Sequence, residues 1–184
     1  MPTPKTKRQT SIGLFYGSST CYTEIAAEKI RDFFNGNSSL ETEVTLQNVA
    51  EYSPKLMPEF DFLILGIPTW DYGELQEDWE AVWSELNDVD LSKKKVALYG
   101  LGDQIGYPEW FQDAMGYLCN KVEERGAEIF GYWPTTGYQF ERSLALTEDE
   151  KHFVGLALDD ETEFELSEQR IRDWCQQLIL EFGL

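Results

Sequence analysis

Short apolar runs recur along the chain, and segments with helical periodicity separate them. Most of these runs are almost continuously apolar, as expected of strands that are buried on both faces of a sheet. They cover residues 11–16, 43–46, 62–67, 96–100 and 127–132. The alternation of strands and helices predicts an α/β fold: a doubly wound, five-stranded parallel sheet with helices on both faces.

The helical segments can be placed from their apolar spacing and their end signals. The first is expected at residues 22–35. In the second, the spacing predicts that Trp79 and Trp83 are core residues. We expect the third helix to open at Pro108, and the last helix to be capped by Ser167.

The segment from about residue 133 to residue 152 breaks this rhythm. It is polar, rich in turn-forming residues and without a clear period. An apolar run resumes at 153–158, so we expect the last strand position to be interrupted by an insertion of about 20 residues. Residues 1–10 are expected to form an N-terminal tail, and residues 11–184 a single domain.

The loop Gly17–Thr23, between the first strand and the first helix, has the chemistry of a phosphate site. The first N–H groups of a helix have no partner within it, and the helix dipole places partial positive charge there. Four hydroxyl side chains add donors, and no residue of the loop is charged. The loop is neither a Walker A sequence nor a dinucleotide fingerprint. A plain helix cap is the alternative interpretation.

Two further loops follow strands, and they reach the same edge of the predicted sheet. They are Pro68–Glu74 and Leu101–Tyr107. Ligands of doubly wound sheets bind at this edge. Trp70 and Tyr107 offer two flat rings, and Asp103 offers an acceptor for a ring N–H. With the phosphate loop, these groups predict a flat heteroaromatic ligand with a phosphate tail, for which FMN is the economical choice.

Charge and composition exclude several classes of function. The formal net charge is −19, with 15 basic against 34 acidic residues, which argues against nucleic acid or membrane surfaces as partners and favours basic-faced proteins. A single histidine and three unpaired cysteines argue against a metal site and most hydrolase chemistry. No apolar run has transmembrane length and residues 1–10 lack a signal-peptide core, so we expect a cytoplasmic protein.

Four segments of the chain carry a resemblance to a known family, and they read GSSTCYTE, GIPTWDYGELQEDWE, LYGLGDQIGYPEWFQDA and FVGLALD. Together they resemble the long-chain flavodoxins, and the form of the first is most similar to the second flavodoxins of enterobacteria. The resemblance runs from about residue 11 to the C-terminus and implies a flavodoxin-like fold that binds FMN non-covalently. The residues then expected to bind FMN are Ser18, Ser19, Thr20, Cys21, Tyr22, Thr23, Pro68, Thr69, Trp70, Asp71, Tyr72, Gly73, Leu101, Gly102, Asp103 and Tyr107.

The resemblance also implies roles for these residues and a function for the chain. Ser18–Thr23 would hold the phosphate, Trp70 and Tyr107 would flank the ring, and Asp103 would meet its pyrimidine edge. The implied function is one-electron transfer at low potential between the semiquinone and hydroquinone forms of FMN, with no catalytic residues. An NAD(P)H-dependent flavodoxin reductase would be the donor and basic-faced redox proteins the acceptors, in transient complexes with a monomer.

One residue departs from the family pattern, and two other functions compete. Cys21 stands where most flavodoxins have glycine, so it is expected to crowd the phosphate or to adopt a glycine-type conformation. An FMN-dependent NAD(P)H or quinone reductase is the alternative, although the three loops hold no basic residue. A signalling receiver is the third candidate, but it needs an acidic cluster for Mg²⁺ that Gly17–Thr23 lacks.

Overall fold

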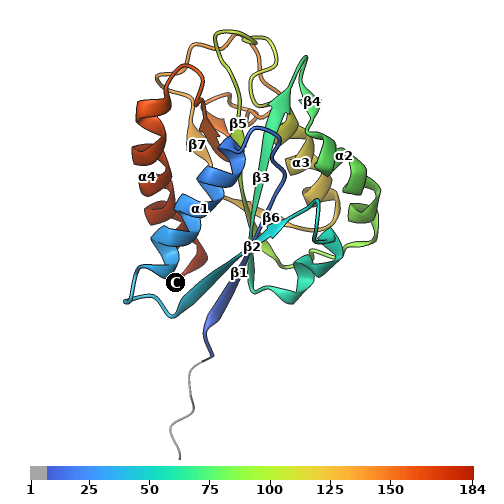
Figure 1. Ribbon diagram of the computed structural model, residues 1–184, viewed down its shortest axis with the longest axis vertical. Helices are drawn as coiled ribbons and strands as arrows, with labels where there is room; N and C mark the ends of the chain where they lie inside the picture. Colours follow the sequence, from blue (N-terminus) through green and yellow to red (C-terminus); the bar gives the residue numbers. More distant parts are fainter. Residues whose placement is uncertain (1–7) are drawn as a thin grey trace, which may run out of the picture.

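The computed structural model describes residues 8–184, which fold around one central and mostly parallel β-sheet (Figure 1). The main strand order is β2-β1-β3-β5-β6, so the predicted doubly wound sheet is confirmed. The bounds are β1 Thr10–Tyr16, β2 Thr42–Asn48, β3 Phe62–Trp70, β5 Lys95–Leu101 and β6 Glu128–Phe130. The strand order reverses between β1 and β3, which is where such sheets form a ligand crevice.

Helices cover both faces of the sheet, and each face has its own apolar core. The helices are α1 Tyr22–Asn35, α2 Glu77–Val82, α3 Asp113–Glu124 and α4 Phe164–Phe182. In Figure 1, α1 and α4 lie on one side of the sheet, and α2 and α3 lie on the other. Alternate residues of β3 supply the two cores, because side chains of a strand point to opposite faces. Leu63 and Leu65 pack in the core that contains Trp79, and Ile64 packs in the core that contains Trp174.

Two short strands share the last position of the sheet. β6 pairs with Lys95–Ala97 of β5, and β9 (Leu156–Leu158) pairs with Tyr99–Leu101 further along the same strand. Residues 131–155 run between them and contain the antiparallel pair β7 (Trp133–Pro134) and β8 (His152–Phe153). The prediction that residues 153–158 form one strand is therefore wrong. Its middle approaches β5 so closely that a Cβ on Gly155 would lie 2.2 Å from the Leu98 carbonyl oxygen.

The sheet extends further at β3 than the sequence predicted. β3 continues through Trp70 because it pairs with β4 (Glu74–Leu75), a two-residue antiparallel strand that the apolar pattern does not reveal. Pro68, Thr69 and Trp70 thus belong to a strand rather than to a loop. The hairpin turn between β3 and β4 is Asp71–Gly73, and it rises above the rest of the sheet.

Two predicted helix starts are wrong, and the hydrogen bonds of Pro108 and Ser167 explain them. The third helix begins at Asp113, not at Pro108, since the Pro108 carbonyl accepts hydrogen bonds from the N–H groups of Glu141 and Arg142. The last helix begins at Phe164, and the Ser167 hydroxyl donates to Asp160 instead of capping it. The second helix tightens into a 3₁₀ segment, Trp83–Asp88, and leaves Trp83 only half-buried, whereas Trp79 is fully buried as predicted.

The first strand begins within the segment that was predicted to be an N-terminal tail. Of the predicted N-terminal tail, residues 1–7 lie outside the described residues, and Thr10 already belongs to β1. Within residues 8–184, no helix has both the length and the apolar character that crossing a bilayer requires.

The segment 131–155 packs tightly against α3. The Leu144 N–H donates to the Asp113 carboxylate at 2.8 Å, and burial raises the pKa of that carboxyl above its ordinary 3.8. Further along the helix, the Leu144 carbonyl lies over Gly116. A Cβ at Gly116 would be 2.3 Å from the Leu144 oxygen, a backbone atom with little room to move.

Because of this contact, we expect alanine at position 116 to have the opposite effect on stability from its usual effect in a helix. Alanine normally stabilises a helix interior by about 1 kcal/mol relative to glycine. Here we expect Gly116→Ala to destabilise the protein by about 1–3 kcal/mol, because it overpacks the contact with Leu144. Urea unfolding measures the change. Asn120→Ala, at an exposed position of the same helix, is the control and should change stability by less than about 0.5 kcal/mol. A Gly116→Ala protein more stable than the parent would refute the packing.

Candidate functional site

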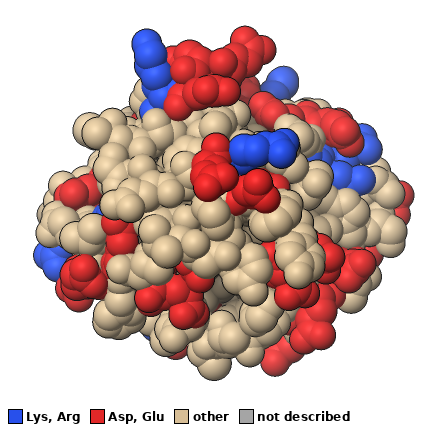
Figure 2. Space-filling view, turned by 90° about the horizontal axis from the view of Figure 1, so that it is seen from above, with Lys and Arg blue, Asp and Glu red and all other residues tan. Residues whose placement is uncertain are grey.

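A cavity opens at the carboxyl edge of the sheet, where the loops after β1, β3, β5 and β9 meet. Its volume is about 330 Å³. Figure 2 looks down on this end of the molecule, where acidic side chains clearly outnumber basic ones. The lining residues are Thr20, Tyr22, Thr23, Pro68, Thr69, Trp70, Asp71, Leu101, Gly102, Asp103, Tyr107, Trp110, Phe111, Asp160 and Glu161. Among these residues, none is basic.

The loop after β1 presents a row of free backbone donors. Within the described chain, the N–H groups of residues 18–24 make no hydrogen bond to another protein group. They lie at the start of α1, where the helix dipole adds partial positive charge. The Ser18 hydroxyl is buried and also lacks a partner. Buried polar atoms are seldom left unpaired, so this loop has the donors and the field to hold an anion.

Two buried side chains fix the position of this loop. The Tyr99 hydroxyl donates to the Thr23 carbonyl oxygen at 2.8 Å, and burial raises the pKa of Tyr99, so it remains a neutral donor. Gln76 is fully buried after β4, and its amide donates to the Ser19 hydroxyl at 3.2 Å. A Cβ at Gly17 would lie 2.1 Å from Oε1 of Gln76. The sequence analysis missed Gln76, since a lone glutamine gives no signal of a structural role.

Cys21 adopts the glycine-type conformation that the sequence analysis expected. Its φ is 67°, in the left-handed region, and it lies immediately before α1 with no side-chain capping bond. Its thiol is exposed and does not line the cavity. Cys21 was expected either to crowd the phosphate or to adopt a glycine-type conformation, and the structure shows the second.

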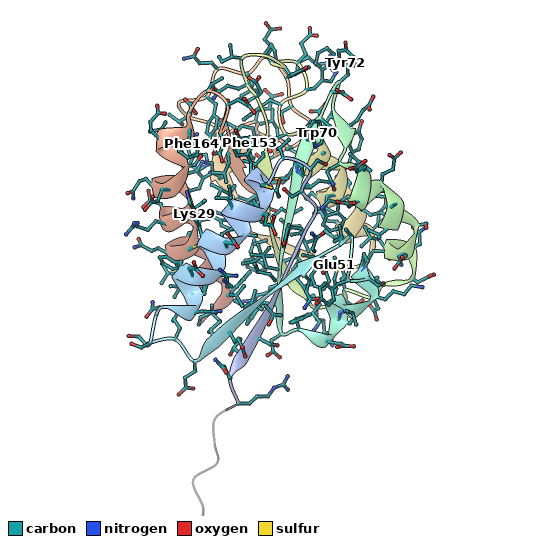
Figure 3. All side chains as sticks on the ribbon, viewed as in Figure 1. Lys29, Glu51, Trp70, Tyr72, Phe153 and Phe164 are labelled. Atoms are coloured by element: carbon teal, nitrogen blue, oxygen red, sulfur yellow. The ribbon has the colours of Figure 1, made fainter. Side chains whose placement is uncertain are left out.

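The hairpin after β3 divides its residues between two faces. Trp70 lines the cavity, and its indole N–H is buried without a partner. Tyr72 does not line the cavity, is 69% exposed and packs against Trp110 with ring centroids 5.2 Å apart. Figure 3 shows Tyr72 at the tip of the molecule, with Trp70 below it. Asp71 and Gly73 have φ values of 45° and 88°, so the turn bends sharply on both sides of Tyr72.

The loop after β5 is held from inside and outside. Asp103 accepts hydrogen bonds from the N–H groups of Ile105 and Gly106, at 3.0 and 2.6 Å, so one of its oxygens serves the loop itself. The neighbouring Gln104 N–H donates to the buried Asp159, directly after β9. Tyr107 lines the cavity and is 44% exposed.

The structure brings together most, but not all, of the residues that the sequence indicated. Ser18, Ser19, Cys21, Tyr72 and Gly73 do not line the cavity. Four lining residues were missed: Trp110, Phe111, Asp160 and Glu161. The last two could have been found, because they follow an apolar run whose carboxyl end belongs at the same sheet edge.

The chemistry of the cavity is that of a binding site. It combines free N–H and O–H donors at one end with aromatic walls and carboxylates at the other. In the described part of the chain, no group of three or more His, Cys, Asp or Glu side chains is placed to hold a metal ion. A phosphate at the α1 end and a flat ring beside Trp70 and Tyr107 fit this distribution.

Comparison with known proteins gives the family. The flavodoxin family model matches residues 14–174. Over 173 residues the chain is 56% identical to Flavodoxin 2 of Escherichia coli K12, a match that covers 94% of this chain and 97% of that one. It is 50% identical to the flavodoxin of Nostoc sp. strain PCC 7120, with 94% and 98% coverage.

Solved structures agree with this relationship. The crystal structure of the Fusobacterium nucleatum flavodoxin mutant K13G bound to flavin mononucleotide matches with a TM-score of 0.86 at 31% identity, covering 94% of this chain and 97% of that one. Flavodoxin 2 of Bacillus cereus matches with a TM-score of 0.70 at 26% identity, covering 94% of this chain and all of that one. With the sheet order, the loop geometry and these matches in agreement, the chain belongs to the flavodoxin family.

Proposed function

We propose that this chain is a low-potential, one-electron carrier that binds FMN non-covalently. Its family consists of electron-transfer proteins, and a 31% identical relative was crystallised with flavin mononucleotide. The observation that carries the proposal is the row of free N–H groups at residues 18–24, with the buried, unpartnered Ser18 hydroxyl beside an aromatic-walled cavity. FMN supplies one-electron redox chemistry when it is bound, and the protein supplies binding and charge.

Different residues are proposed to bind the two ends of the cofactor, the phosphate and the ring. Ser18–Thr23 hold the phosphate through backbone N–H groups and hydroxyls. Trp70 and Tyr107 would flank the ring, and the backbone of Leu101–Asp103 would bind its polar edge. Because no residue of Gly17–Thr23 is charged, the loop would leave the phosphate charge uncompensated, and that charge would oppose further negative charge nearby.

The surrounding carboxylates act in the same direction. Asp71, Asp103, Asp160 and Glu161 line the cavity, and no cation among the described lining residues offsets them. A unit charge at about 10 Å in a high dielectric opposes a like charge by about 0.4 kcal/mol. Several such charges lower the potential at which the ring accepts its last electron, and salt screens part of the effect.

Partners follow from charge. With a net charge of −19, the protein favours basic-faced partners, so an NAD(P)H-dependent flavodoxin reductase is the proposed donor and basic-faced redox proteins are the proposed acceptors. We place this monomeric carrier in the cytoplasm. An FMN-dependent reductase is the less favoured alternative, because the described cavity lining has no basic group to bind the phosphates of NADPH.

The visible spectrum of the purified protein tests the proposal first. We expect flavin absorption bands, and release of FMN by acid. The holoprotein should take up electrons from dithionite in two resolved one-electron steps, and should not oxidise NADPH unless a reductase is added. A protein that stays colourless after incubation with FMN would refute cofactor binding. Rapid NADPH oxidation by the protein alone would support the enzyme.

Neutralising two lining carboxylates should raise the lower midpoint potential. Asp71→Asn with Glu161→Gln removes about 1 kcal/mol of repulsion, which corresponds to an increase of about 40 mV for one electron. Asparagine tolerates the positive φ of residue 71. Spectroelectrochemistry at low salt measures the shift. Glu128→Gln, at the start of β6 and therefore at the opposite sheet edge, is the control and should change the potential by less than about 10 mV. Equal shifts of the midpoint potential in the double variant and in Glu128→Gln would contradict the electrostatic account.

Glycine at position 21 should relieve backbone strain without loss of the cofactor. A non-glycine residue in the left-handed region costs about 1 kcal/mol or more. The Cys21→Gly apoprotein should therefore be more stable than Cys21→Ala by about 1 kcal/mol, although glycine normally destabilises a chain relative to alanine. Urea unfolding of the two apoproteins measures the difference. The FMN dissociation constants of the parent and of Cys21→Gly should agree within about threefold. A much weaker Cys21→Gly complex would show that the thiol contributes to binding.

A further inference from the structure

A second concave area lies beside the cofactor cavity, on the outer side of the β3–β4 hairpin. It consists of two hollows of about 250 and 390 Å³ that share Tyr72 and Tyr117. Trp110 and Leu144 line the first hollow, and Leu75 and Trp83 line the second. We call these six residues the outer aromatic surface. Trp110 also lines the cofactor cavity, so the two sites are direct neighbours.

Leu75 and Trp83 also pack against the core, but the fold does not account for the exposure of three of the other side chains. Tyr72, Tyr117 and Leu144 are 69%, 46% and 49% exposed. Tyr117 projects outward from α3, while its neighbours Gly116 and Leu118 face the core side of the helix. The Tyr72 ring is already held in place by its edge-on contact with Trp110. Contiguous exposed apolar groups with a polar rim mark interaction sites, and aromatic side chains are enriched among residues that dominate binding energy.

The charges around the outer aromatic surface indicate what it binds. Glu74 and Glu80 line one hollow, and Glu109 and Asp113 line the other. Arg142 is the single basic residue among the described residues that line the two hollows, and it lies in the same hollow as Asp113. The net field is therefore negative. A complementary partner presents an apolar or aromatic side chain flanked by lysine or arginine.

We propose that the outer aromatic surface anchors the redox partner. This inference rests on the proposed function. A partner side chain enters the hollows next to Tyr117, its basic neighbours pair with the rim carboxylates, and the docked partner lies beside Trp110 at the cofactor cavity. A second copy of this chain is a poorer occupant, because it brings the same negative charge to the interface.

Kinetics with a purified NADPH-dependent flavodoxin reductase test the proposal on the FMN-loaded protein. Tyr117→Ala should raise the KM for the carrier about tenfold at unchanged kcat, as expected for the loss of an aromatic anchor. Its FMN dissociation constant and midpoint potentials should stay at the parent values. Tyr52→Ala is the matched control, because Tyr52 is 43% exposed and follows Glu51, which lies well away from Tyr72 (Figure 3). The control should change KM by less than about twofold.

Three results would overturn the inference. Equal KM values for Tyr117→Ala and Tyr52→Ala would show that the surface is not an anchor. Sedimentation that reveals a dimer of the parent, lost in Tyr117→Ala, would assign the surface to a second copy. If the parent binds no FMN or receives no electrons from the reductase, the proposed function itself fails. That outcome is distinguishable, because the first two leave FMN binding and the potentials of the parent intact.

Discussion

A row of free backbone donors, with no basic side chain among the described cavity-lining residues, is the constraint on which the proposed site depends. The free N–H groups of residues 18–24 can bind a phosphate only if β1 ends and α1 begins within a few residues of each other. Gly17 gives Gln76 the space to reach Ser19, and Tyr99 secures the first turn of α1 from below. None of the described cavity-lining residues is basic, so a phosphate bound as proposed would keep its charge uncompensated, and the proposed binding and low potential would have one physical origin.

Hydrogen bonds from other parts of the fold hold the loop after β5 in position at the cavity. The segment 131–155 supports the loop after β5 from outside: the Gln139 N–H donates to Gln104 at 2.6 Å, and the Pro108 carbonyl accepts two further bonds from the segment. Asp159, after β9, supports the same loop from the sheet side. A segment without regular periodicity thus takes part in shaping the edge of the cavity, through hydrogen bonds that order its backbone and the loop together.

The sequence was informative where apolar periodicity or a local loop pattern carries the signal, and uninformative where distant groups meet. The doubly wound parallel sheet, the position of α1 and the glycine-type conformation of Cys21 could be predicted. The start of α3 could not, because the Pro108 carbonyl bonds to residues more than thirty positions away. Gln76 was missed for the same reason, and spacing alone does not show that Tyr72, at the tip of a hairpin, is 69% exposed and outside the cavity lining.

Calorimetric titration of the apoprotein with FMN and with riboflavin tests the central claim most directly, because the two ligands share the ring and differ in the phosphate. Several hydrogen bonds to a charged group contribute about 3 kcal/mol or more, so FMN should bind at least about 100-fold more tightly than riboflavin. Ser18→Ala should reduce that ratio while leaving riboflavin binding unchanged. Affinities of FMN and riboflavin within threefold of each other would contradict the claim that residues 18–24 hold the phosphate.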